Sequence, residues 1–276
     1  MLRKPRTALI GAGRMGSAML RGWAAAAGFA PDGSIMVIDP HLRDSVTELV
    51  VNHKGRVANA ANQEMFSKLE TLILAVKPQR FEETAKTLAP LLPKDVLILS
   101  VIAGISLNRL ENSFGPGPHV RAMPNTAAEI GQSISVLCPN DKVSPDALQR
   151  AEQILAAIGQ VETIDDERLM DVVTAVSGSG PAYFFLLAEA LAAAGQSEGL
   201  PEELAAKLAS QTMIGAGALL QSRGQSPREL RGEVTSPGGT TAAALDVMIG
   251  NGAFAEIMRN AISAAARRSI KLRNSD

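Results

Sequence analysis

A glycine-rich segment near the N-terminus is the first group of residues with recognisable chemistry. It reads GAGRMG over residues 11–16, between the β-rich run TALI and a helical pattern. In such a strand–turn–helix unit the first glycine allows a tight turn, the second lets a pyrophosphate approach the backbone, and the third allows close packing. The segment predicts a dinucleotide site; a glycine turn that serves packing alone is the alternative. The predicted contacts are Gly11, Gly13, Arg14, Met15 and Gly16.

An acidic residue, Asp39, ends the next β-rich run. A carboxylate at this position commonly accepts hydrogen bonds from the hydroxyl groups of an adenosine ribose, and it opposes a 2′-phosphate. Asp39 therefore favours NADH over NADPH. His41 and Arg43 follow closely and could bind a 2′-phosphate instead, and Asp39 could equally be a turn residue before Pro40. The preference between the two cofactors stays open at this point.

Two further β-rich runs end in residues that suit a cofactor. The run LILAV leads into Lys77, at the edge of a parallel sheet where ligands bind. This lysine could meet a phosphate or a ribose hydroxyl, or it could be an ordinary solvated side chain. The next run ends in SVIAG, residues 100–104, whose small residues leave room for a ring.

A second cluster of polar residues lies in the C-terminal half. Residues 234–241 read VTSPGGTT and precede the helical pattern AAALDVMIG. Several hydroxyls and two glycines at a helix start provide N–H and O–H donors without formal charge, which suits a carboxylate. An ordinary capped helix is the alternative. The segment SGSGP, residues 177–181, repeats the theme, with close helix packing as its alternative.

The composition excludes several classes of protein. The chain has 276 residues, 46% apolar and 3% aromatic, with a net charge of −1, so a nucleic-acid platform is not expected. A single cysteine, Cys138, excludes an intramolecular disulfide framework, and the three histidines show no metal-ligand spacing, so no metal is expected. The longest apolar run, residues 96–105, is shorter than the roughly 18 residues of a membrane span. We expect a soluble cytoplasmic protein with no membrane segment.

Conventional acid–base groups are scarce. No GxSxG motif occurs, and the one tyrosine, Tyr183, is not part of a YxxxK pair. A hydride acceptor that is already cationic, such as a protonated imine, would fit this scarcity.

The order of the predicted elements indicates an α/β fold with two domains. Short β-rich runs alternate with helical patterns up to about residue 163, which predicts a Rossmann-type domain with a parallel sheet. Residues 164–276 are rich in Ala, Leu, Met and Glu and predict an all-α dimerisation domain. Its apolar faces favour self-association; a helical layer packed on the sheet domain is the alternative. The predicted strands are 7–10, 34–39, 71–76, 96–101, 119–123 and 133–138, and the long helices are 14–28, 79–91, 144–158, 181–194, 201–222 and 252–272.

Taken together, these segments resemble the pyrroline-5-carboxylate reductase family. The resemblance runs nearly end to end, and its last segment is close to the family's signature pattern. It implies reduction of (S)-1-pyrroline-5-carboxylate to L-proline by NADPH or NADH. It also implies a helical domain that interlocks with a second subunit in a homodimer, with a decamer built of dimers as the larger assembly. The segments are GAGRMG, LAVKPQ, SVIAGIS, RAMPNT, TAVSGSGPAYFF and LRGEVTSPGGTTAAAL.

The resemblance also assigns roles by position. The Gly11–Gly16 loop holds the pyrophosphate, and Asn62 reaches the adenosine ribose region. Thr241 lies near the ring nitrogen of the substrate as a catalytic hydrogen-bond partner. The ribose and nicotinamide are lined by Ala75, Val76, Lys77, Pro78, Val101, Ile102 and Ala103, and the substrate carboxylate is bound by Ser236, Gly238, Gly239, Thr240 and Thr241.

Two positions depart from the family pattern, and two rival functions remain. Ala127 stands where a proline is common, and Asp39 stands where many members have serine or another neutral residue. A 3-hydroxyacid or 6-phosphogluconate-type dehydrogenase would carry a catalytic lysine in the first long helix of the helical domain, and residues 181–194 contain none. A nucleotide-sensing module would not need the donor-rich segment at 234–241.

Overall fold

The computed structural model describes residues 6–26 and 35–274. By their contacts the residues form two compact units: a sheet unit, 1–178 with 265–276, and a helical unit, 179–264. The expected division after residue 163 differs from this one. Residues 164–178 remain with the sheet because Met170 is buried against Met123 and Cys138. The end of the chain returns to the same unit, which no sequence pattern indicated.

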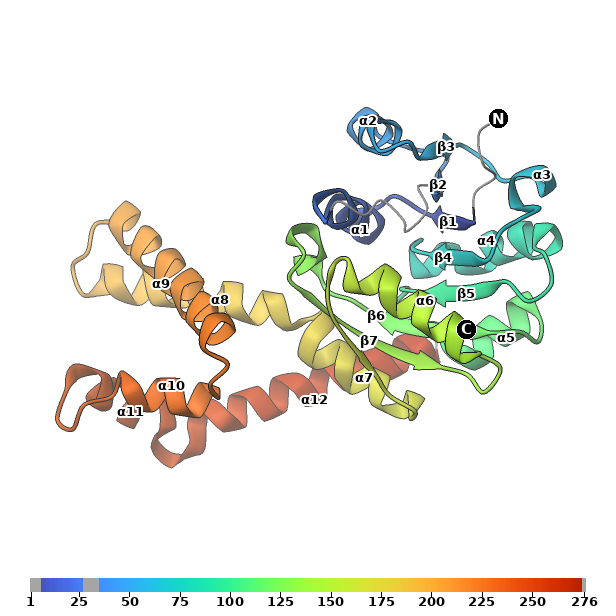
Figure 1. Cartoon of the computed structure of the whole chain (residues 1–276). Helices are drawn as coiled ribbons and strands as arrows, with labels where there is room; N and C mark the ends of the chain where they lie inside the picture. Colours follow the sequence, from blue (N-terminus) through green and yellow to red (C-terminus); the bar gives the residue numbers. More distant parts are fainter. Residues whose placement is uncertain (1–5, 27–34, 275–276) are drawn as a thin grey trace. The chain divides into compact units, whose positions relative to one another are not determined.

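The sheet unit is built on eight strands in the order β3-β2-β1-β4-β5-β6-β7-β8 (Figure 1). The α/β Rossmann-type fold predicted from the sequence is confirmed, but the sheet is not wholly parallel. β7 runs antiparallel to β6, and β8 is parallel to β7. The chain between β6 and β7, residues 124–132, is too short for a parallel crossover of a dozen or more residues. The strands are β1 (Thr7–Ile10), β2 (Ile35–Ile38), β3 (Arg56–Ala58), β4 (Thr71–Leu74), β5 (Leu97–Ser100), β6 (His119–Met123), β7 (Ser133–Pro139) and β8 (Gly159–Thr163).

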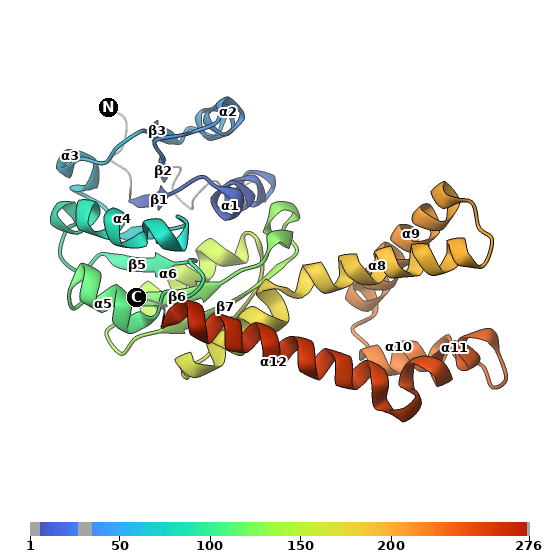
Figure 2. The ribbon, with the colours of Figure 1, turned by 180° about the vertical axis from the view of Figure 1, so that it is seen from behind.

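Helices cover both faces of this sheet because neighbouring strand residues point to opposite sides. Leu9 belongs to one buried cluster with α1 (Arg14–Ala25), α2 (Asp44–Asn52) and α6 (Pro145–Ala156). Ala8 belongs to the other, with α3 (Gln63–Phe66), α4 (Phe81–Leu88) and α5 (Leu107–Phe114). Helix α6 covers the face seen in Figure 1, and α4 and α5 cover the face seen in Figure 2. Short 3₁₀ turns occupy Pro78–Arg80, Ala89–Leu91, Thr126–Ile130 and Glu167–Leu169.

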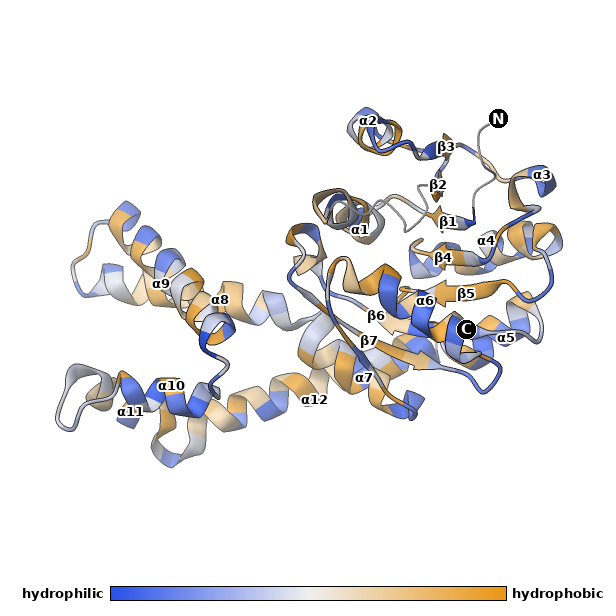
Figure 3. Cartoon of the chain, viewed as in Figure 1, coloured by the Kyte–Doolittle hydropathy of each residue, from blue (hydrophilic) through white to orange (hydrophobic). Residues whose placement is uncertain are grey.

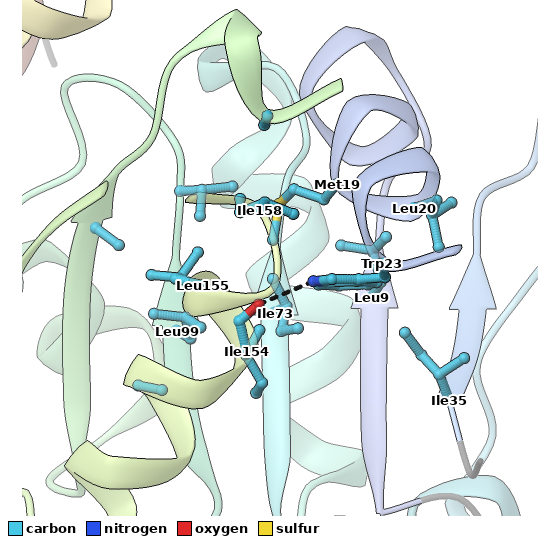
Figure 4. Packing of buried hydrophobic residues seen from close by; sticks show 14 of the residues in the cluster. Leu9, Met19, Leu20, Trp23, Ile35, Ile73, Leu99, Ile154, Leu155 and Ile158 are labelled. Atoms are coloured by element: carbon cyan, nitrogen blue, oxygen red, sulfur yellow. Dashed lines mark hydrogen bonds between the residues drawn. The ribbon is translucent and has the colours of Figure 1, made fainter. Parts of the chain in front are cut away.

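A tryptophan ties α1 to α6 inside the first cluster. Trp23 is 3% exposed, and its Nε1 donates to the Ile154 carbonyl at 2.8 Å (Figure 4). The indole thus buries its ring and still satisfies its one polar group. This fixes the helix that follows the glycine loop against the body of the sheet unit.

Two segments complete the sheet unit after the last strand. The chain passes through α7 (Met170–Val173) and a π-helix, Thr174–Gly178, before it enters the helical unit. The end of α12 (Ala253–Arg273) then rejoins the sheet unit from residue 265 onward.

The helical unit contains helices but almost no interior of its own. Its helices are α8 (Gly180–Ser197), α9 (Glu202–Arg223), α10 (Pro227–Glu233), α11 (Thr240–Ile249) and the first part of α12, with a short 3₁₀ turn at Gly250–Gly252. In the single chain, the buried residues among 179–264 are Gly180, Ala205 and Ala209. Apolar residues recur along α8, α9 and α11 in Figure 3. Large exposed ones include Phe184, Phe185, Leu186, Leu208, Ile214 and Val247.

Candidate functional site

The predicted cofactor residues gather at one edge of the sheet. Strands β1, β2, β4 and β5 are parallel, so the loops that follow them leave from the same edge. Backbone hydrogen bonds continue past the strand ends, from Gly11 N to Ile38 O at 2.9 Å and from Ala75 N to Ile10 O at 2.8 Å. The strand order reverses its direction between β1 and β4, and ligands of such sheets bind in the crevice at that point.

The three glycines of the first loop have three different environments. Gly11 has φ +94°, and a Cβ there would lie 2.8 Å from the Ala75 carbonyl oxygen. A Cβ on Gly16 would lie 2.1 Å from the Gly11 oxygen, which is an impossible contact. At Gly13, by contrast, a Cβ would meet no heavy atom of the described chain within 4 Å. The first and third glycines therefore shape the turn, while the second leaves open space beside the start of α1, where a pyrophosphate would fit.

Asp39 is joined to this loop by its carboxylate. Oδ2 accepts from the Ala12 N–H at 2.7 Å, and Oδ1 accepts from the His41 N–H at 2.8 Å. The second bond forms an Asx turn, so the turn role considered from the sequence is present. Because each carboxylate oxygen has a second lone pair, a ribose hydroxyl could still donate to it.

A cation lies close to the same corner. Arg43 is exposed, and its Nη2 donates to Ser17 Oγ at 3.1 Å. Ser17 Oγ in turn donates to the Ala12 carbonyl at 2.7 Å. The glycine loop is thus flanked by the anion Asp39, which would repel a 2′-phosphate, and by the cation Arg43, which would attract one.

The other predicted cofactor residues lie on loops of the same unit. Lys77 is exposed after β4 and immediately precedes a 3₁₀ turn. Asn62 is the N-cap of α3, where its side chain accepts from the Met65 N–H at 2.9 Å, so a capping role accounts for its type. After β5, Val101 and Ile102 are buried while Ala103 is exposed at the loop's tip.

The segment Ser236–Gly239 forms a tight turn in the helical unit. Gly239 N donates to Ser236 O at 3.0 Å, Pro237 occupies the second position, and Gly238 has φ +71°. This combination defines a type II turn, which explains the Pro-Gly pair. A Cβ on Gly239 would lie 2.5 Å from Ser236 Oγ, so a larger residue there would force the serine hydroxyl to rotate away.

This turn presents the start of α11. Within the described residues no side chain caps this helix, whose N-cap is Gly239. The first-turn N–H groups of Thr240 and Thr241 are therefore open to an acceptor supplied from outside. A carboxylate would match them.

Metal and thiol chemistry have little support in the structure. Among residues 6–26 and 35–274, no group of three or more His, Cys, Asp or Glu side chains could hold a metal ion. Burial raises the pKa of the Cys138 thiol to about 11, which disfavours the reactive thiolate. Burial likewise lowers the pKa of His119, whose Nε2 lies 2.9 Å from the Gly115 carbonyl oxygen.

Sequence reasoning missed a group of charged residues in the sheet unit. Arg121 on β6 is fully buried, and Asp171 on α7 is 2% exposed. Their side chains form an ion pair, with Nη2 and Oδ1 3.7 Å apart. An arginine inside the β-rich run HVRAM was the only available signal, because its partners lie far along the chain.

One helical stretch of the described chain, residues 167–197, is long and apolar enough to cross a membrane by length and composition alone. No uninterrupted apolar run marks this stretch in the sequence, because Asp171, Glu189 and several small polar residues interrupt it. The exposed apolar side chains of α8 lie within it.

Comparison with known proteins identifies relatives over the whole chain. Residues 167–272 match a family model described as pyrroline-5-carboxylate reductase dimerisation, and residues 6–104 match one described as NADP oxidoreductase, coenzyme F420-dependent. The pyrroline-5-carboxylate reductase of Pseudomonas aeruginosa is 40% identical over 269 residues, which cover 97% of each chain.

Solved structures give the same picture. A pyrroline-5-carboxylate reductase from Coxiella burnetii has a TM-score of 0.88 and 32% identity, with 98% of this chain and 99% of that chain covered. The Plasmodium falciparum pyrroline carboxylate reductase, solved with NADP bound, has a TM-score of 0.81 and 28% identity, with 99% and 100% covered.

Proposed function

The chain belongs to the pyrroline-5-carboxylate reductase family, and we propose that it catalyses the reduction of (S)-1-pyrroline-5-carboxylate to L-proline, the last step of proline biosynthesis. The observation that carries the proposal is the type II turn at Ser236–Gly239, which leaves the start of α11 uncapped. A charge-free donor site of this kind suits the substrate's carboxylate. We further propose that the enzyme is cytoplasmic and works as a homodimer, with a decamer built of such dimers as its larger assembly.

The glycine loop would hold the cofactor. Gly13 provides the open approach, and the start of α1 provides N–H donors for the pyrophosphate. Ala75, Val76, Lys77 and Pro78, with Val101, Ile102 and Ala103, would line the ribose and nicotinamide; Arg14, Met15 and Asn62 complete the proposed contacts. When bound, the reduced nicotinamide supplies a hydride to the C=N carbon.

The chain's own residues would bind and orient the substrate. Ser236, Gly238, Gly239 and Thr240 hold its carboxylate at the start of α11. The ring nitrogen carries its proton before the transfer, so hydride addition alone gives the secondary amine, and Thr241 Oγ1 accepts a hydrogen bond from that N–H. Most of the rate then comes from holding the reacting carbon at about 3–3.5 Å from the nicotinamide.

The first test is the oxidation of reduced nicotinamide by the purified protein with pyrroline-5-carboxylate, run separately with NADH and NADPH. We expect oxidation with proline as the product. A folded protein that binds the cofactor and oxidises it with neither would contradict the proposal and favour a sensing role.

The Thr241→Ala variant tests the substrate site. We expect a lower kcat, by about tenfold or more for the loss of one positioned hydrogen bond, with cofactor binding nearly unchanged. Isothermal titration with the cofactor and steady-state kinetics separate the two effects. A large loss of cofactor affinity would contradict the assignment of Thr241.

Cofactor preference is the finer proposal. We infer that NADH is preferred, because the Asp39 carboxylate lies at the end of β2 and opposes a 2′-phosphate. Asp39→Asn is the sharp variant, since an amide oxygen can still accept from the Ala12 N–H while the charge is removed. The ratio of kcat/KM for NADPH to that for NADH should rise about tenfold, equivalent to about 1.4 kcal/mol.

Arg43→Ala should change the NADPH-to-NADH ratio of kcat/KM in the opposite direction. Removing this cation should weaken NADPH more than NADH, because only the former has the additional phosphate. If neither variant changes the ratio, Asp39 is a turn residue and Arg43 a surface cation.

A further inference from the structure

Charged groups from distant parts of the sheet unit converge on one buried carboxylate. Asp171 Oδ1 accepts from Ser269 Oγ at 2.7 Å and lies 3.7 Å from Arg121 Nη2. Asp171 Oδ2 lies 3.3 Å from Arg273 Nη2. This buried carboxylate therefore joins β6, α7 and the end of α12, which are separated by about fifty to a hundred residues or more along the chain.

The same cluster reaches the loop after β5 at its far end. Glu167 Oε1 accepts from Arg121 Nη1 at 3.0 Å and also from the Leu107 N–H at 2.9 Å. Leu107 is the first residue of α5 and directly follows that loop. The carboxylate of Glu167 thus ties the loop's exit to the buried arginine.

The end of α12 contacts the loop at a second point. Gly104 has φ +80°, and a Cβ there would lie 3.5 Å from Leu272, so the two segments are already in close approach. Ile102 and Ile105 are 2% and 1% exposed. The loop is therefore held by its buried isoleucines and by the bond at Leu107, while Ala103 remains exposed.

We propose that Arg121 and Asp171 are positioning residues for hydride transfer, which seat Glu167 and the end of α12 against residues 101–107 and so set the position of the nicotinamide-lining loop. This inference rests on the proposed function for its kinetic consequence, but the placement of the loop can be measured without it. The residues would act only through the loop, because none of their described partners is a reacting atom.

Because several polar atoms of the cluster lack hydrogen bonds, its stability depends on the balance of its charges. Arg121 Nε and Nη2, Asp171 Oδ2 and Arg273 Nε are buried without a hydrogen-bond partner among the described residues. Opposite charge therefore holds much of the cluster together. Removing one charge leaves the others buried and unbalanced, which favours a displacement of Glu167 and of the end of α12 from the loop.

Hydrogen exchange tests the placement directly in the full-length protein. In Asp171→Asn and Arg121→Met, we expect amide exchange in residues 101–107 to accelerate by about tenfold or more, with strand β4 unchanged. The matched control is Val50→Ala, which opens a cavity beneath α2, a helix that packs against α1 and β3. It should lower overall stability without a selective change at 101–107.

Kinetics then separates positioning from general destabilisation. In the two charge variants kcat should fall about tenfold with a smaller change in the KM of the cofactor, and the isotope effect with 4-deuterated cofactor should rise as hydride transfer becomes slower. A merely structural role would lower the active fraction and leave the isotope effect unchanged. Arg121→Lys keeps the charge and should recover part of the rate.

Two milder variants keep the test decisive if the charge variants fail to fold. Ser269→Ala removes one hydrogen bond to Asp171, and Glu167→Gln keeps an acceptor for the Leu107 N–H but loses its charge. Both should accelerate exchange at 101–107 to a smaller extent. Unchanged exchange in both would overturn the inference, whereas a wild-type protein inactive on pyrroline-5-carboxylate would overturn only the proposed function.

Discussion

The sheet unit and the helical unit differ in how they bury their apolar side chains. The sheet unit packs helices on both faces and encloses two large apolar clusters within one chain. The helical unit leaves Phe185 and Leu186 of α8 67% and 63% exposed, and α11 has no buried residue. Patches of this kind mark interaction surfaces in soluble proteins. The contrast indicates that one unit is complete in a single chain and the other requires a second copy.

Charging the exposed face of α8 should have the largest effect. In Phe185→Asp combined with Leu186→Asp, carboxylates would be buried in the proposed dimer contact at a cost of about 3 kcal/mol or more each. We expect loss of the dimer by sedimentation velocity and loss of nearly all activity. The control is Val51→Asp on α2, 54% exposed in the sheet unit, which should change neither. A dimer that persists in this α8 variant would contradict the inference that the helical unit buries its apolar side chains against a second copy.

A smaller effect is expected from alanine in the glycine loop, where the sheet unit is closely packed. Gly16→Ala places a methyl group 2.1 Å from the Gly11 oxygen, so α1 must shift at a cost of about 1–3 kcal/mol. Thermal unfolding should report the loss, together with weaker cofactor binding.

Gly13→Ala is the variant to compare with Gly16→Ala. Because its Cβ would meet no described heavy atom within 4 Å, the fold should keep its stability while the pyrophosphate is obstructed. Equal losses of stability in the two variants would contradict the separate roles assigned to these glycines.

The smallest effect is a pH dependence at His119 in the sheet unit. Burial is the largest cause of its lowered pKa, and Lys142 acts in the same direction; hydrogen bonds with the Gly115 and Pro118 backbone and the charge of Glu111 oppose them. The unfolded chain therefore binds the proton more readily. Stability should be full above about pH 6.5 and decline as the pH falls from there through the lower folded pKa. Urea unfolding of the wild type and His119→Gln at several pH values would measure it; parallel curves for the two proteins would assign the dependence to other groups.

Local residue patterns predicted six of the eight strands of the sheet unit, but not helices α2, α3 and α5. β1 and β6 were predicted at their observed bounds, and α1, α6 and α9 within a few residues. Two short edge strands, β3 and β8, were missed. The residues RVA and GQVET are only partly buried or exposed, so they lack the apolar run by which the inner strands were recognised.

The proposed site likewise has some residues that the sequence indicated and some contacts that only the fold shows. Gly11, Asp39 and the Pro-Gly-Gly turn were visible in the sequence because their chemistry depends on a few adjacent residues. Ser17 and Arg43 were not associated with one another, although they share a hydrogen bond. Only the parallel pairing of β1 with β2 brings the residues that follow the two strands together.

The sequence by itself determined the fold class, the two kinds of domain and the positions of the proposed cofactor and substrate loops, since each depends on hydrophobic periodicity or on a short motif. The tertiary structure alone decided which carboxylate faces which cation. Arg121, Asp171 and Arg273 are far apart along the chain, and no local pattern requires them to meet. They are brought together because α7 packs against the sheet and the last turns of α12 return to it, so that each buried charge finds its partner only in the folded chain.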